Sequence, residues 1–279
     1  MPTVVIATAI AMFAFAANSI LARLAMADGA ADPIGFTVMR LASGALFLAL
    51  TLAFRRAPKS PLPGSWPSAL ALFGYATAFS LAYVRIGAAA GALILFASVQ
   101  ATMIFWSLRN GERPRPLQLA GMLMAFAGIL YLFLPGIGRP DPTGSLLMVV
   151  SGVAWGVYSL RGRGVADPIG ATAGNFIRSV AFCLPLLAIG WSTLHITSTG
   201  LASALLSGVV ASGLGYVIWY RALPSLDATV AAIVQLTVPI IASAGAIVLL
   251  GEQSTLRFAL ASVLVLCGVA VTIMARRRR

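Results

Sequence analysis

The chain has 279 residues, of which 60% are hydrophobic and only 9% are charged, and its mean hydropathy is +0.97. A soluble domain carries about 25% charged residues, so these values exclude an ordinary soluble protein and indicate a membrane protein. The net charge of +12 does not indicate nucleic-acid binding, because four basic residues end the chain as Arg276–Arg279 and most others lie between apolar runs. Basic residues in such gaps are topology anchors.

Proline, glycine and charged residues divide the chain into ten apolar segments, each near the roughly 20 residues that a membrane-spanning helix needs. The first segment lacks the basic region of a cleavable signal peptide, so we predict that it is a span. The fold class is therefore predicted as an all-α polytopic membrane protein. The ten helices are expected at residues 3–25, 34–54, 66–84, 88–108, 116–135, 143–161, 169–190, 199–220, 226–249 and 256–275.

The basic residues of the loops favour one side of the membrane. With the N-terminus inside, thirteen lie on the inner side: Arg55, Arg56, Lys59, Arg109, Arg113, Arg115, Arg161, Arg163, Arg221 and Arg276–Arg279. Four lie on the outer side: Arg23, Arg85, Arg139 and Arg257. Because lysine and arginine are retained on the cytoplasmic side, we predict a multi-pass protein of the bacterial inner membrane with both termini in the cytoplasm.

The sequence ADPIG occurs twice, at residues 31–35 and 166–170. Other matches keep the same order at nearly constant offsets. The segment "MFAFAANSILAR" overlays "GVAWGVYSLRGR" with an offset of 140, and Glu112 matches Glu252 with the same offset. The chain is therefore predicted to contain an internal repeat. The ADPIG copies themselves are predicted helix starts, because proline suits a first helical turn and aspartate can cap it.

The two repeats are predicted at residues 1–137 and 141–279, with five spans in each. Because five is an odd number, the second repeat enters the membrane from the opposite side. Inverted repeats of this kind are typical of alternating-access transporters, whose substrate sites lie near the midplane between the halves. The repeat thus predicts a transporter with a central site.

The two halves contain the corresponding segments "YVRIGAAAGALILFASVQATMIFWSLRNGER" and "YRALPSLDATVAAIVQLTVPIIASAGAIVLLGEQ". Over essentially the whole chain, this pattern resembles the EamA-type repeats of the drug/metabolite transporter superfamily, and among them bacterial YddG-type amino acid exporters. The resemblance implies a structural role for Glu112 and Glu252 in the Gly-Glu motif. The family's proline in the fourth span of each repeat is Pro239 in the second half, but Thr102 stands at the equivalent position of the first.

Few polar side chains lie inside the predicted spans, and they are the candidates for a substrate site. Tyrosine hydroxyls in hydrocarbon need partners, which favours positions that face a wet cavity, although aromatic stripes more often serve packing. Mid-span amides can bind substrate or can hold helices together. The predicted binding residues are Asn18, Tyr83, Gln100, Trp155, Tyr158, Tyr220 and Gln235.

Pro239 gives a further reason to include Gln235. A proline leaves the carbonyl four residues earlier without its helical hydrogen bond, and that carbonyl belongs to Gln235. We therefore predict a helix kink at Pro239 and a free carbonyl on Gln235. Kinked spans with unpaired backbone are where transporters place substrate contacts.

Arg40 and Arg178 lie inside spans at near-equivalent places of the two repeats. Snorkelling to the nearer interface is the simpler interpretation; the alternative is a gating role or a contact to a substrate carboxylate. All seven acidic residues lie in or beside loops, whereas proton- and sodium-coupled carriers commonly place a carboxylate in the membrane. This favours a facilitator or exchanger, or coupling through backbone carbonyls, over carboxylate-driven antiport.

We predict export of small metabolites, above all amino acids including aromatic ones, by alternating access. The chain is not predicted to be an enzyme or to hold a cofactor or metal, because sequence motifs such as HExxH are absent and Cys183 and Cys267 lack metal-ligand spacing. The expected partners are a small-molecule substrate and the lipid bilayer, with the chain a monomer or homodimer. Three alternatives stay open: a multidrug or cation exporter, a nucleotide-sugar or phosphate-ester carrier, and an integral membrane enzyme.

Overall fold

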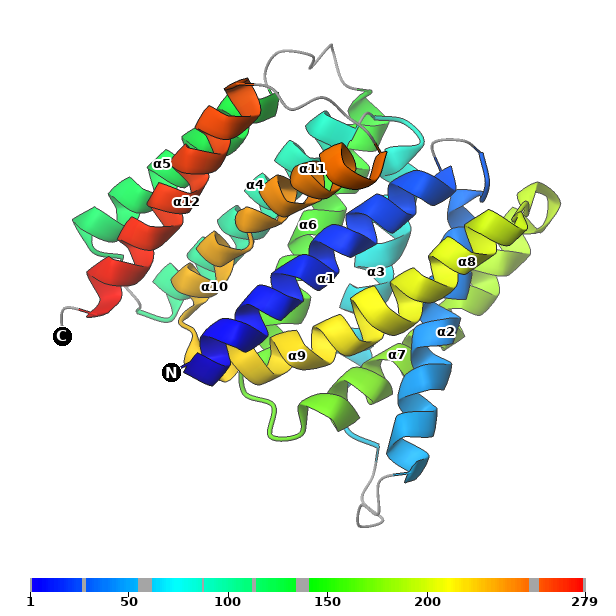
Figure 1. Ribbon diagram of the computed structural model, residues 1–279. Helices are drawn as coiled ribbons and strands as arrows, with labels where there is room; N and C mark the ends of the chain where they lie inside the picture. Colours follow the sequence, from blue (N-terminus) through cyan, green and yellow to red (C-terminus); the bar gives the residue numbers. More distant parts are fainter. Residues whose placement is uncertain are drawn as a thin grey trace.

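The computed structural model of the chain describes residues 2–26, 29–54, 62–86, 88–111, 114–133, 141–250 and 256–277. These residues are almost entirely helical (Figure 1). The helices are α1 (Pro2–Met26), α2 (Pro33–Phe54), α3 (Trp66–Tyr83), α4 (Ala88–Arg109), α5 (Pro116–Phe133), α6 (Pro142–Gly162), α7 (Pro168–Gly190), α8 (Ser198–Leu206), α9 (Gly215–Ala222), α10 (Ala228–Val234), α11 (Thr237–Leu250) and α12 (Leu256–Arg277). Five helical segments of the described part are long and apolar enough to cross a membrane, and several other apolar helices are shorter.

The predicted spans correspond to these helices, which confirms the fold class. Two spans are built differently from the expectation of one regular helix each. The eighth consists of α8, a π-helical segment at Ser207–Leu214, and α9. The ninth is divided at Gln235 and Leu236 into α10 and α11. Both irregular spans belong to the second half of the chain.

Helix starts follow the sequence signals closely. Asp32 precedes α2, and its Oδ1 accepts hydrogen bonds from the backbone N–H groups of Ile34 and Gly35, both at 2.9 Å. Asp167 occupies the N-cap position of α7 and is followed by proline, but its side chain makes no capping hydrogen bond. The prediction that both ADPIG copies start helices is therefore confirmed, and side-chain capping occurs in the first copy.

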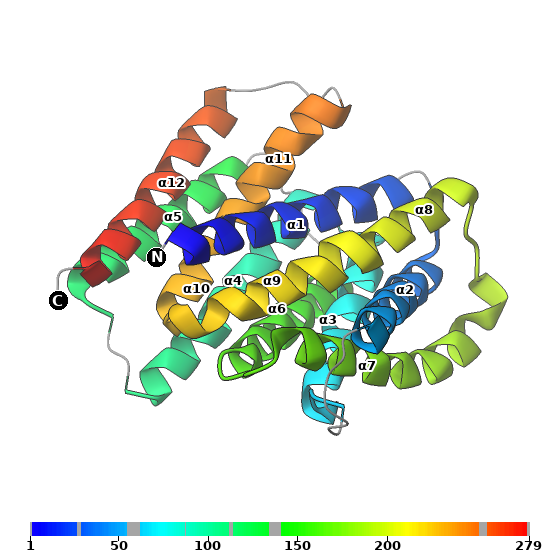
Figure 2. The same ribbon diagram turned by 60° about the horizontal axis from the view of Figure 1, so that its bottom comes forward.

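The two halves of the chain interlock, because most close helix pairs join one half to the other. The pairs are α2–α7, α5–α12, α3–α6, α1–α9, α4–α6 and α1–α11. Exchanging each helix for its counterpart in the other half (α1 with α6, α2 with α7, α3 with α8–α9, α4 with α10–α11, α5 with α12) converts this set of pairs into itself. Figures 1 and 2 both show α1 beside α9, and α5 beside α12 at one edge of the bundle.

At one end of the bundle the loop before α2 is joined to the loop after α7. Ala31 and Ile196 form an isolated antiparallel bridge. The Asp32 N–H donates to the His195 carbonyl at 2.8 Å, and the His195 N–H donates to Asp32 Oδ2 at 2.8 Å. We call residues 30–32 and 195–197 the His195 clasp, which ties the first half of the chain to the second.

At the opposite end, the turn before α3 is held by the first turns of α7. Arg178 donates from Nη1 to the Pro63 carbonyl and from Nη2 to the Leu62 carbonyl, both at 2.9 Å. The Ser65 N–H donates to Asn175 Oδ1 at 3.0 Å. These five residues form the Arg178 clasp. Helices α2 and α7 therefore run antiparallel, with the two ADPIG copies at opposite ends of the bundle (Figure 1).

The contact between α5 and α12 is made through glycine. A Cβ added at Gly121 would lie 2.7 Å from the Gly268 carbonyl oxygen, and a Cβ at Gly268 would lie 2.6 Å from the Ala125 nitrogen. Small residues of this kind allow membrane helices to approach closely. The two helices consequently pack backbone against backbone.

Replacing Gly268 with valine is expected to separate α5 from α12 and to destabilise the protein by about 1–3 kcal/mol, because an overpacked contact must shift its neighbours. Thermal unfolding of the detergent-purified protein measures the effect. Gly74→Ala is the control, since within the described part of the chain its Cβ would meet only Ala154 Cβ, at 3.9 Å. Equal unfolding temperatures for both variants would contradict the prediction.

Candidate functional site

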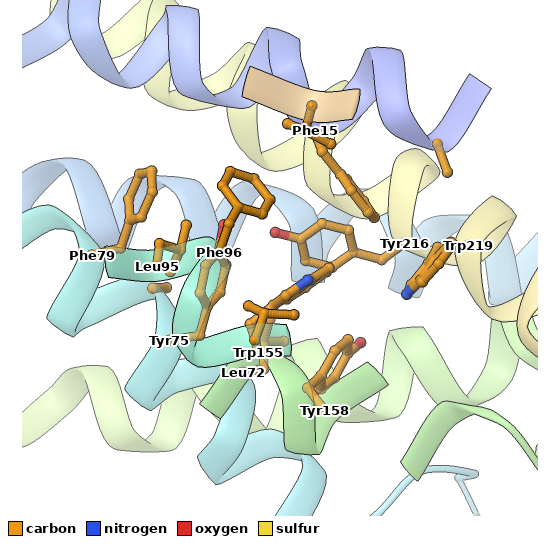
Figure 3. Close-up of a cluster of buried hydrophobic side chains, with 14 of the residues drawn as sticks. Phe15, Leu72, Tyr75, Phe79, Leu95, Phe96, Trp155, Tyr158, Tyr216 and Trp219 are labelled. Carbon is orange, nitrogen blue, oxygen red and sulfur yellow. The ribbon is translucent and has the colours of Figure 1, made fainter. Parts of the chain in front are cut away.

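A cluster of buried aromatic side chains occupies the middle of the bundle (Figure 3). Trp155 of α6 is at its centre and is 5% exposed. Its ring centroid lies 5.1 Å from that of Phe15, 4.9 Å from that of Tyr75 and 4.8 Å from that of Tyr216. Helices α1, α3, α6 and α9 thus contribute rings to one cluster, which joins the two halves of the chain.

The cluster extends into a ladder of rings between the two ends of the bundle. The spacing i, i+4, i+8 on α3 places three of these rings on one helix face. Successive ring centroids along the ladder are 4.5 to 5.6 Å apart. In order, its members are Tyr83, Phe79, Tyr75, Trp155, Tyr158 and Tyr220. Four of the seven predicted binding residues belong to it.

Gln235 is joined directly to the centre of the cluster. Trp155 Nε1 donates to Gln235 Oε1 at 2.6 Å. The amide nitrogen of Gln235 donates to the Ala231 carbonyl at 2.9 Å and lies 3.4 Å from the sulfur of Met103. A fully buried amide in hydrocarbon needs such partners, and here they fix its orientation toward the indole.

The predicted free carbonyl on Gln235 is wrong. The helix is interrupted between α10 and α11, before Pro239. At this interruption the Val238 N–H donates to the Gln235 carbonyl at 3.0 Å. The Thr237 hydroxyl donates to the Val234 carbonyl at 2.7 Å. Pro239 falls in the first turn of α11, where its missing N–H is tolerated. The break thus satisfies its own backbone groups, and Gln235 offers a side chain and not a carbonyl.

Asn18 links α1 to both α3 and the π-helical segment. Its Nδ2 donates to the Tyr75 hydroxyl at 3.4 Å, and its Oδ1 accepts a hydrogen bond from the Ser207 hydroxyl. Ser212 of the same segment accepts a hydrogen bond from Arg40. Residues five apart on an α-helix diverge by about 140°, whereas the i→i+5 bonding of a π-helix allows both serines to face the bundle interior.

Arg40 lies beside the aromatic cluster and does not reach the surface, since it is 0% exposed. Its Nε donates to Ser212 Oγ at 3.0 Å, and its Nη2 donates to the hydroxyls of Tyr216 at 2.6 Å and Tyr75 at 3.4 Å. The guanidinium carbon is 5.2 Å from the centre of the Tyr75 ring, within the range of a cation–π contact. The simpler expectation of snorkelling therefore does not describe Arg40.

Other predicted residues lie away from this centre. Arg178 belongs to the Arg178 clasp, so the two arginines at near-equivalent places of the repeats have different surroundings. Tyr83 is half-buried at the end of α3. Gln100 of α4 is 7% exposed, and its Oε1 has no hydrogen-bond partner among the described residues. Glu112 and Glu252 lie outside the described residues.

Five residues of the centre were not among the predicted binding residues: Phe15, Tyr75, Ser207, Ser212 and Tyr216. Tyr216 could have been included from its spacing, because it lies one turn before Tyr220, as Phe79 lies one turn before Tyr83. No comparable signal identifies the serines, since a π-helix is not visible in hydrophobic periodicity.

The described part of the chain also contains a cavity of about 1330 Å³ between α1 and the α10–α11 span. Its walls are almost entirely apolar, with residues such as Val4, Met12, Val234 and Ile241. None of the seven predicted binding residues lines it. The aromatic centre is closely packed in this conformation, so a molecule could bind there only if the rings separate.

Comparisons with known proteins agree with the fold and the internal repeat. The sequence profile of the EamA-like transporter family matches residues 2–134 and again residues 142–274. A protein of Pseudomonas aeruginosa, itself uncharacterised, is 49% identical over 272 residues, which cover 98% of this chain and 95% of that protein. A probable amino-acid metabolite efflux pump of Salmonella typhimurium is 27% identical over 219 residues, which cover 72% of this chain and 73% of that protein.

The fold also has a counterpart of known structure. A protein solved by crystallography superposes with a TM-score of 0.82 and covers 98% of this chain and 99% of its own. The two sequences are 22% identical, so the similarity shows the fold alone.

Proposed function

The chain belongs to the EamA-like transporter family, and we propose that this transporter exports small metabolites, chiefly amino acids including aromatic ones. The observation that carries the substrate proposal is the aromatic cluster around Trp155, with the Gln235 amide and the Asn18 amide at its edge. Rings suit an apolar side chain, and amides suit the polar end of a zwitterion. The Salmonella typhimurium relative, whose name refers to amino-acid metabolites, points the same way.

The proposed mechanism is alternating access around this centre. The His195 clasp closes one end between the halves and the Arg178 clasp closes the other. Opening one clasp while the other stays closed would expose the aromatic cluster to one side only. In inverted-repeat carriers, rocking of one half against the other produces such an exchange.

Uptake into proteoliposomes tests the function. Purified protein is reconstituted and challenged with labelled phenylalanine, tryptophan, leucine and glutamate, with protein-free liposomes as the baseline. We expect saturable uptake of apolar and aromatic amino acids. Uptake of none of them, by protein that remains folded, would overturn the amino-acid proposal.

The proposed orientation places both termini in the cytoplasm of a bacterial inner membrane. In Figure 1 both ends of the chain lie at the same end of the bundle, so the two termini are expected on the same side of the membrane. A phosphatase fused after Arg279 is expected to stay inactive, and a green fluorescent protein fused there to fluoresce, because the first requires the periplasm and the second the cytoplasm. The reverse pattern would contradict the positive-inside argument.

A carrier of nucleotide sugars or phosphate esters has less support. Such substrates call for several cations at the site. Of the two arginines inside the predicted spans, Arg40 lies beside the centre of the aromatic cluster, whereas Arg178 is engaged with the turn before α3.

A further inference from the structure

Arg40 is a buried cation whose charge no described residue neutralises. Its hydrogen-bond partners among the described residues are the hydroxyl oxygens of Tyr75, Ser212 and Tyr216, all of them neutral groups. The described aspartates lie at helix starts, among them Asp32 in the His195 clasp. In addition, Arg40 Nη1 has no hydrogen-bond partner among the described residues although it is buried.

This arrangement is costly for a purely structural residue. A charge inside a low-dielectric environment is strongly unfavourable unless it is paired and its donors are satisfied. Ionisable side chains inside membrane spans are accordingly rare, and they mark substrate or ion pathways. Hydroxyl partners satisfy some donors of Arg40 but leave its positive charge unopposed.

We propose that Arg40 binds the carboxylate of the transported molecule, so that the substrates are small carboxylates with an apolar or aromatic side chain; this deepens the proposed function and rests on it. A carboxylate can accept two parallel N–H···O hydrogen bonds from a guanidinium. The unpartnered Nη1 supplies a donor for one of these bonds.

The aromatic cluster places the rest of such a substrate. Tyr75 and Tyr216 each contact both Arg40 and Trp155: their hydroxyls accept from Arg40, and their rings lie 4.9 and 4.8 Å from the indole. Each of these tyrosine side chains therefore spans the distance between Arg40, where the carboxylate would bind, and the Trp155 ring. One small molecule can occupy both positions.

Substrate binding also affects the contact between the halves. Arg40 belongs to α2 of the first half, while Ser212 and Tyr216 belong to the second. A carboxylate competes with these hydroxyls for the same guanidinium donors. Binding thus weakens one connection across the repeat interface at the moment when the substrate is captured.

The test compares carboxylates with their amides in binding to the detergent-purified protein. The probes are phenylalanine with phenylalaninamide, and 3-phenylpropionate with 3-phenylpropionamide, and the readouts are ligand-induced thermal stabilisation and quenching of tryptophan fluorescence. The variants are Arg40→Gln and Arg40→Lys. Arg115→Gln is the matched control, because Arg115 Nη1 donates to the Ala275 carbonyl at the edge of the bundle.

We expect wild type to bind at least one carboxylate about 10- to 100-fold more tightly than its amide, the size of a charge-assisted hydrogen bond. Arg40→Gln should remove this preference, Arg40→Lys should reduce it because a point charge replaces the guanidinium fork, and Arg115→Gln should keep it. The proposal is overturned if no pair shows a preference, or if Arg40→Gln retains it. The two proposals can fail separately, because 3-phenylpropionate is a carboxylate but not an amino acid. An Arg40-dependent preference for 3-phenylpropionate, together with no amino-acid uptake, would support the carboxylate site and reject amino-acid export.

Discussion

Replacing Trp155 with alanine is expected to abolish uptake and to lower the free energy of unfolding by about 3–5 kcal/mol. The indole contacts the rings of Phe15, Tyr75, Tyr158 and Tyr216 and is 5% exposed, so its removal opens a cavity where the two halves meet. The measurements are proteoliposome uptake per folded protein and thermal unfolding.

Trp155→Phe separates the two roles of the indole. It keeps a ring in the cluster but removes the Nε1–H that donates to Gln235 Oε1 at 2.6 Å. A buried acceptor left unpaired costs about 1–3 kcal/mol, so stability should fall less than in Trp155→Ala. Trp191, which is 76% exposed, provides the control: Trp191→Ala should leave uptake close to that of wild type. Normal uptake by folded Trp155→Ala protein would remove Trp155 from the substrate site.

Replacing Gly174 with valine is expected to prevent closure of the Arg178 clasp and to slow transport strongly. Any Cβ at this position would overlap the Pro63 carbonyl oxygen, which accepts from Arg178 in the closed clasp. Overpacking costs about 1–3 kcal/mol. Because the overlap exists only when the clasp is closed, this energy should change the ratio of the closed to the open conformation by about 5- to 150-fold.

Cysteine labelling measures this shift. Ala171 is 3% exposed and its carbonyl faces Gly64 of the turn before α3, so Ala171→Cys in a background without the native cysteines reports opening at that end. A water-soluble maleimide should react faster when Gly174→Val is added. Gly200→Val is the reciprocal variant, because a Cβ there would overlap the Ala30 carbonyl of the His195 clasp.

The labelling experiment has a neutral control as well. Among the described residues, no atom lies within 4 Å of a Cβ added at Gly164, so Gly164→Ala should change neither labelling nor uptake. Gly200→Val should not accelerate labelling at Ala171→Cys, because it acts at the other end of the bundle. Acceleration by both valine variants would indicate general loosening of the fold and not a directed shift between two conformations.

Helix positions could be predicted from sequence because each depends on local signals. Apolar runs of spanning length, and proline or aspartate at helix starts such as Asp32, are properties of short segments. The internal repeat could also be predicted from sequence, since matching residues keep a nearly constant offset along the chain. The aromatic stripe of Tyr75, Phe79 and Tyr83 could also be read from spacing, because a helix places residues four apart on one face.

The details of the site depended on contacts between distant segments. The kink was predicted at Pro239, but the helix is interrupted earlier, at Gln235 and Leu236. The Gln235 carbonyl is not free, because the Val238 N–H donates to it. A proline in the sequence predicts that a helix is interrupted nearby, but the residue at which the interruption occurs depends on tertiary packing. The same limit applies to the π-helical segment, whose serines reach Arg40 and Asn18 from the other half.

Arg40 and Arg178 have near-equivalent sequence positions but different environments in the folded protein. The repeat placed the two arginines at near-equivalent positions in spans of the two halves, and composition established that a charge there is unusual. Their surroundings include residues more than a hundred positions away: Ser212 and Tyr216 around Arg40, and Pro63 beside Arg178. Burial and hydrogen bonding across the interface are properties of the folded pair of repeats, so only the structure could show that one arginine holds a turn and the other keeps an unopposed charge among aromatic rings.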